Sequence, residues 1–205
     1  MPSYARIATD RREFEHILRS VGSSVKCDGR LPKWPFLAQK SYIHFVEYDR
    51  VLGGDFGATL LALARAYGDS SVAFVAVEPS ARCYSDLYGT MPGFEVDLHV
   101  LEKGYAEGIG HEPGGDPNGA LAYASDALAI AGSSGRWGLW GQREWEIALL
   151  STPQDDGPWL RTPVPLYGRG INLESIRSPA GWSTPLNEQE RGELCRNIRL
   201  RGSGA

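Results

Sequence analysis

The sequence predicts a single α+β domain over residues 1–205, with a mixed β-sheet of about five or six strands and helices mainly on one face. Two observations indicate this class. Segments with helical periodicity lie at both ends of the chain, and short apolar or β-branched segments separated by glycine and proline lie between them. The alternative is a doubly wound α/β sandwich, because strand and helix patterns alternate between Tyr42 and Leu101.

The first helix is expected in the segment TDRREFEHILRSVG near the N-terminus. Its apolar side chains recur at helical spacing, which predicts an amphipathic helix. Thr9 or Asp10 can accept a hydrogen bond from a free backbone N–H group at its start, and Gly22 is a suitable residue to end it.

Three strands and two helices are expected next. Residues 41–49 are rich in β-branched and aromatic residues and predict a strand. A glycine-rich turn then leads to the helix ATLLALARAYG, which ends at Gly68, and residues 71–78 are apolar enough for a strand covered on both faces. After the short helix PSARCYSDLYG, residues 94–101 alternate between apolar and polar and predict a half-buried strand.

The remaining segments give weaker or mixed signals. Six glycines between Gly104 and Gly119 predict a long loop, whereas residues 120–131 combine a helix-favouring, alanine-rich start with a strand-like end. Residues 152–183 form a Pro/Gly-rich excursion. A C-terminal helix is expected over 185–198, with Thr184 as its cap and Pro185 at its first position.

The segment SSGRWGLWGQREWEIALLS predicts a β-hairpin. If its strands are 136–140 and 143–150, Gly141 occupies the first position of a two-residue turn, where a positive φ favours glycine. Trp145 then packs over Gly138 on the core face of the sheet.

The opposite face of this hairpin is a candidate binding surface. In the same register Trp137 and Leu139 share a face with Glu144 and Glu146, so the large aromatic ring is expected to be partly exposed. Exposed aromatic anchors ringed by polar groups are typical of protein-binding surfaces.

The stretch WGLWGQREWEIALL also resembles the Trp-rich hairpin of small cytoplasmic bacterial proteins, many of which are immunity proteins that neutralise polymorphic toxins. The resemblance spans under a tenth of the chain. It implies a non-enzymatic, cytoplasmic protein-binding protein, and the acidic balance of the chain suits a basic partner such as a toxin domain.

The alternative function is a metal-assisted hydrolase. Period-2 geometry places Glu95, Asp97 and His99 on one face of the expected strand, where two carboxylates and an imidazole can ligate a divalent metal or carry out acid–base catalysis. His111 in the glycine-rich loop is a further candidate ligand. The competing interpretation, which we prefer, is the solvated face of an amphipathic strand. No cofactor is predicted.

Composition excludes several classes of protein. The formal net charge of −4 argues against general nucleic-acid binding, and no run reaches the roughly 18 apolar residues of a membrane span. The charged N-terminus does not resemble a signal peptide.

Three widely spaced cysteines argue against a disulfide framework and for a reducing compartment, so we expect the cytoplasm. Cys27 has no identifiable histidine partner and is expected to be unreactive.

Overall fold

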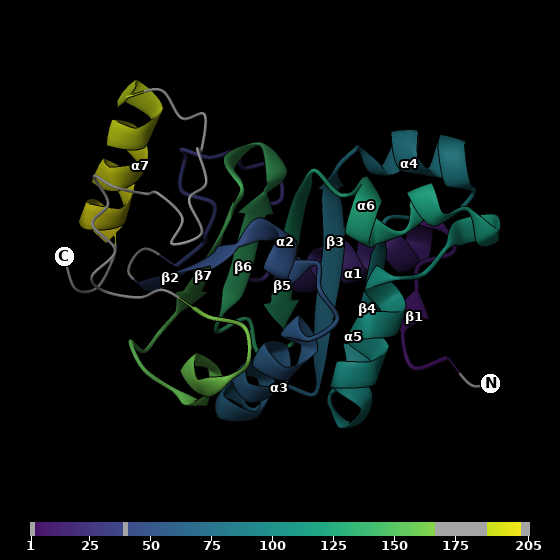
Figure 1. Ribbon diagram of the computed structural model, residues 1–205, viewed down its shortest axis with the longest axis horizontal. Helices are drawn as coiled ribbons and strands as arrows, with labels where there is room; N and C mark the ends of the chain where they lie inside the picture. Colours follow the sequence, from purple (N-terminus) through teal and green to yellow (C-terminus); the bar gives the residue numbers. More distant parts are fainter. Residues whose placement is uncertain (1–2, 39–40, 167–187, 202–205) are drawn as a thin grey trace.

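The computed structural model describes residues 3–38, 41–166 and 188–201. Its centre is a seven-stranded sheet with the order β1-β4-β3-β5-β6-β7-β2, and every neighbouring pair is antiparallel (Figure 1). The strands are β1 (Arg6–Ile7), β2 (Tyr42–Glu47), β3 (Ser71–Glu78), β4 (Gly93–Asp97), β5 (Ala127–Gly132), β6 (Gly138–Gln142) and β7 (Ile147–Thr152).

Helices cover both faces of this sheet. One face is covered by α2 (Tyr48–Val51), α3 (Phe56–Tyr67), α5 (Leu101–Ile109) and α6 (Leu121–Ala124), and the other by α1 (Arg11–Val21) and α7 (Glu188–Arg201). Helix α4 (Ala81–Tyr88) follows β3 and packs Tyr84 into the first of these two layers. The predicted α+β class is therefore confirmed. The sheet is larger than expected and wholly antiparallel, which rules out the doubly wound alternative.

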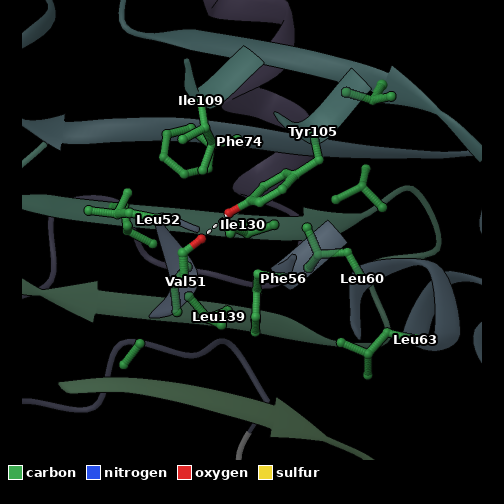
Figure 2. Packing of buried hydrophobic residues seen from close by; sticks show 14 of the residues in the cluster. Val51, Leu52, Phe56, Leu60, Leu63, Phe74, Tyr105, Ile109, Ile130 and Leu139 are labelled. Carbon is green, nitrogen blue, oxygen red and sulfur yellow. Dashed lines mark hydrogen bonds between the residues drawn. The ribbon is translucent and has the colours of Figure 1, made fainter. Parts of the chain in front are cut away.

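Strand periodicity divides the core into two hydrophobic clusters. In β3, Val72 and Phe74 point into the cluster under α3 and α5, whereas Ala73 and Val75 point into the cluster under α1. Figure 2 shows part of the first cluster, where the Tyr105 hydroxyl of α5 donates a hydrogen bond to a backbone carbonyl of α2. A strand buried on both faces explains why its sequence is apolar at almost every position.

Helix α1 begins as its sequence predicts. The Asp10 side chain accepts a hydrogen bond from the backbone N–H of Glu13 at 2.8 Å, and Glu13 in turn accepts the backbone N–H and hydroxyl of Thr9. The Asp10 bond satisfies a donor that the first helical turn leaves unpaired, and Glu13 reaches back to the residue before the cap, one position beyond its partner in a standard capping box. Helix α3 likewise ends as expected, at Gly68 with a φ of 72°.

Helix α5 lies where the sequence predicted strand and then loop. Strand β4 ends at Asp97, a short 3₁₀ turn follows, and α5 occupies the first half of the expected glycine-rich loop. A Cβ atom at Gly104 would lie 2.3 Å from Val96, and one at Gly108 would lie 2.5 Å from the ring of Phe94. These glycines therefore allow a helix to approach the sheet closely, which a count of loop-forming residues does not reveal.

The hairpin exists, but its predicted register was wrong. Gln142 pairs with Ile147, so four residues rather than two form the turn, and Gly141 lies inside β6 opposite Ala148. Gly141 is needed there because a Cβ would lie 3.0 Å from the ring of Tyr48. The longer turn allows Trp145 to pack into the cluster under α1 instead of covering Gly138.

The predicted excursion over 152–183 is partly described. Its start, up to residue 166, packs against the core through Trp159, which is fully buried and lies 5.3 Å from the ring of Tyr67. Residues 167–183 lie outside the described residues, as do Thr184 and Pro185, the expected start of the last helix. The C-terminal helix itself is present as α7.

Candidate functional site: an acidic rim at the β6–β7 turn

The apolar half of the predicted binding surface is not on the surface. Trp137 and Leu139 are 1% and 0% exposed, and both belong to the cluster under α3. The prediction of an exposed aromatic anchor was therefore wrong. The prediction failed because the helical layer that contains α3 and α5 covers the hairpin face that the sequence pattern assigned to solvent.

The acidic half of that surface is exposed, and the fold adds to it. Glu144 and Glu146 lie in the β6–β7 turn, and neighbouring segments contribute Asp49 of α2, Glu78 at the end of β3 and Asp126 before β5. We call these five residues the acidic rim. They come from four separate segments of the chain, so only the folded protein brings them together.

Arg143 is the cation at the centre of the rim. Its Nη1 lies 3.3 Å from the carboxylate of Asp49, and its Nε lies 3.5 Å from that of Asp126. The same guanidinium donates to the backbone carbonyls of Ser125 at 3.0 Å and Ala122 at 3.2 Å. Arg143 is therefore held in place by the protein itself, through Nε and both terminal nitrogens.

The other nearby arginines are also paired within the protein. Arg30 donates to Glu78 through two nitrogen atoms, which lowers the pKa of Glu78, and Arg50 lies 3.5 Å from Glu47. A hollow of about 380 Å³ lies between Glu78, Asp126, Gln142, Arg143 and Glu144. Among the described residues, the ion pairs of the five rim carboxylates are made with Arg30 and Arg143, so the rim keeps an excess of negative charge.

Glu146 holds an unfavourable backbone conformation at the tip of the rim. Among the described residues it is the one non-glycine residue with a positive φ, 53°. The left-handed conformation costs a residue with a side chain about 1–2 kcal/mol, which glycine avoids. Strain of this kind persists where the surrounding structure holds it, and it concentrates at functional sites.

The alternative catalytic residues do not form a common site. Glu95 and Asp97 share a face of β4, but the strand ends there and His99 lies in the following 3₁₀ turn, so the prediction of one row was wrong for His99. Glu95 is 7% exposed and accepts hydrogen bonds from Ser71 at 2.6 Å and Arg6 at 2.8 Å. Its carboxylate is thus occupied in fixing the edge of the sheet.

The proposed metal ligands are not brought together either. Within residues 3–38, 41–166 and 188–201, no three His, Cys, Asp or Glu side chains are placed to hold a metal ion. His111 is exposed beyond the end of α5.

Burial raises the pKa of the Cys27 thiol to about 11, so this cysteine is protonated at neutral pH and is a poor nucleophile.

One buried polar site, around Asp69, was not predicted from the sequence. This carboxylate is 3% exposed and accepts hydrogen bonds from the backbone N–H of Ser134 at 2.6 Å and the indole N–H of Trp137 at 2.7 Å. A Cβ at Gly132 would lie 2.3 Å from it. In the sequence Asp69 is an aspartate in a turn after Gly68, where such residues are common, so no local pattern distinguishes it.

In the part of the chain that the structure describes, no helix has the length and apolar character needed to cross a membrane. Comparison of the chain with protein-family models, with curated proteins and with solved structures gives no match.

Proposed function

We propose that this protein acts by binding a basic protein partner, and that the acidic rim is its contact surface. The observation that carries the proposal is the convergence of five carboxylates from four segments, all exposed except the partly buried Glu78, around arginines that are already paired. Charge complementarity of this kind steers association and selects partners.

The strained conformation of Glu146 supports a functional role for the turn. A glycine would fit the same backbone without strain, yet the position holds an exposed carboxylate at the tip of the rim. A residue that lowers stability at a position where glycine would not is a candidate for a functional contact.

The partner that fits the proposal is a basic toxin domain, and the protein would then be an immunity-type inhibitor in the bacterial cytoplasm. Three arguments support this: the resemblance of the hairpin segment, the net negative charge of the chain and the few, widely spaced cysteines. Binding is preferred to catalysis because the alternative catalytic residues Glu95, Asp97 and His99 do not form a common site, and the described residues hold no group of three side chains placed to bind a metal ion.

The test compares two charge reversals of equal size. Tagged wild-type protein, the rim variant Glu144→Lys/Glu146→Lys and the control variant Asp86→Lys/Glu112→Lys are used to capture partners from the native cells. The captured partner is identified, and its dissociation constant is measured by calorimetry at low and high salt. We expect a basic partner whose affinity falls about tenfold or more in the rim variant, with a smaller difference at high salt.

The control variant should bind the same partner within about twofold of wild type, since its carboxylates lie away from the rim. An acidic partner, or an equal loss of affinity in both variants, would overturn the proposal. If the partner is a toxin, co-expression of wild-type protein should restore growth, and co-expression of the rim variant should not.

A further inference from the structure

A second polar site lies between helix α1 and the edge of the sheet. A groove of about 500 Å³ is lined there by Arg6 and Glu95 from the sheet and by Arg12, His16 and Arg19 from the helix. Its volume is in the range of small-molecule binding sites in proteins.

The carboxylates of this groove, Asp10, Glu13 and Glu95, are already engaged by donors within the protein. Asp10 and Glu13 cap helix α1, where the positive end of the helix dipole offsets their charge, and the hydrogen bonds from Thr9 lower the pKa of Glu13. The charge of Glu95 is offset by Arg6, whose guanidinium lies 2.8 Å from it.

The three basic side chains on the helix, in contrast, have no carboxylate partner. Within the described residues, no carboxylate lies within ion-pair distance of Arg12, His16 or Arg19. Arg19 donates its Nε to the backbone carbonyl of Glu15, which leaves its two terminal nitrogens for another acceptor. The groove therefore presents the guanidinium groups of Arg12 and Arg19 as hydrogen-bond donors that no protein carboxylate occupies.

The three side chains share one face of the helix. Positions 12, 16 and 19 follow the spacing of one helical stripe and span roughly 10 Å along the axis. Arginine side chains hold a phosphate through two parallel hydrogen bonds, and a phosphate offers more charge and one more acceptor oxygen than a carboxylate. A set of three donors suits the larger anion better.

We propose that this groove binds a small phosphorylated compound. Arg12, His16 and Arg19 contact the phosphate. The oxygen atoms of Asp10 and Glu13 that the capping bonds leave free accept hydrogen bonds from hydroxyl groups on the remainder of the ligand. This site is separate from the acidic rim, because the two share no lining residue.

The test uses glycerol 3-phosphate as the probe, with malonate as the carboxylate comparison and sodium chloride at matched ionic strength as the blank. Binding to the full chain is followed by two-dimensional ¹H–¹⁵N NMR and by thermal unfolding. We expect saturable shifts concentrated in the backbone amides of α1 and a rise in Tm that the blank does not produce.

Two double variants decide whether the groove is responsible. Arg12→Gln/Arg19→Gln should weaken binding of glycerol 3-phosphate about tenfold or more, whereas Arg11→Gln/Arg82→Gln, which removes the same charge from exposed side chains outside the groove, should stay within about twofold. Arg12→Lys/Arg19→Lys should fall between them, since lysine keeps the charge but lacks the planar fork.

Three outcomes would overturn the proposal. These are the absence of saturable binding to wild type, an equal loss in the Arg11/Arg82 variant, and malonate binding as tightly as glycerol 3-phosphate. The wild-type NMR map tests the location of the site even if a variant folds poorly.

Discussion

Asp69 joins two parts of the chain that are 68 residues apart, because its carboxylate holds the indole of Trp137. Asp69→Ala leaves that buried indole N–H without an acceptor and removes the bond to the backbone N–H of Ser134, so we expect the free energy of unfolding to fall by about 3 kcal/mol in urea denaturation. Asp86→Ala, at an exposed carboxylate, should change it by less than about 0.5 kcal/mol. Equal losses would show that the Asp69 bonds contribute little.

Backbone strain at Glu146 can be tested by comparing a glycine substitution there with the same substitution at Glu144, a glutamate in the same turn. Glu146→Gly relieves the positive φ, and after the added flexibility of the unfolded chain is subtracted, we expect a gain of about 0.5–1 kcal/mol in unfolding free energy. Glu144→Gly, in the preceding 3₁₀ turn, should instead lose about 0.5–1 kcal/mol. Calorimetric melts measure both variants, and a loss of unfolding free energy in both would mean that Glu146 is not strained.

His44 should make stability depend on pH. Its Nε2 lies 3.1 Å from the Thr152 hydroxyl, which donates to the carbonyl of Gln154, and burial lowers the pKa of His44 despite the nearby charge of Asp155. The unfolded chain therefore takes up a proton at a higher pH than the folded protein does.

The stability that neutral His44 contributes is fully present above its unfolded pKa of about 6.5 and is lost as the pH falls from there towards the folded pKa. We expect the Tm of wild type to fall between pH 7.5 and 5.5, and the fall to be smaller in His44→Gln. Parallel curves for the two proteins would exclude His44 as the titrating group.

At the scale of elements, the glycines of α5 show what local sequence signals leave out. Both strand β4 and the loop after it were predicted too long, because alternation continued past Asp97 and six glycines followed. The helix forms because packing of its buried face against α3 and β4 outweighs the poor helix propensity of Gly104 and Gly108.

Gly108 therefore differs from a helical glycine that touches little. Gly108→Ala should lower the unfolding free energy by about 1–3 kcal/mol, because the new Cβ would lie 2.5 Å from the Phe94 ring. Gly192→Ala in α7, whose nearest neighbour is 3.8 Å away, should raise it by about 0.5–1 kcal/mol through helix propensity. Denaturant titration measures both, and a gain at Gly108 would contradict the close packing.

At the scale of the whole molecule, two hydrophobic clusters share one sheet. Trp137 and Trp159 lie in the cluster under α3, and Trp34, Trp140 and Trp145 lie in the cluster under α1. Because the same strands contribute to both clusters, loss of one layer exposes apolar side chains of the strands that support the other.

We therefore expect cooperative unfolding of the two layers. Tryptophan fluorescence and far-ultraviolet circular dichroism should give the same midpoint in urea within experimental error. Separate midpoints would show that one helical layer detaches while the sheet persists.

The sequence by itself determined the α+β class, the position of β3, the start of α1, the end of α3 and the presence of a hairpin, because each depends on signals within a few residues, such as caps, turn glycines and alternation. It also identified Glu144 and Glu146 as exposed carboxylates. These are local properties of the chain.

Tertiary structure decided the rest. Only the helical layer that contains α3 buried Trp137 and Leu139, and only the docking of α5 turned a glycine-rich segment into a helix. The acidic rim and the groove beside α1 each unite distant segments. A strand pattern shows that two faces differ, but which side chains solvent reaches depends on what packs over each face, and that is set by contacts far apart in the sequence.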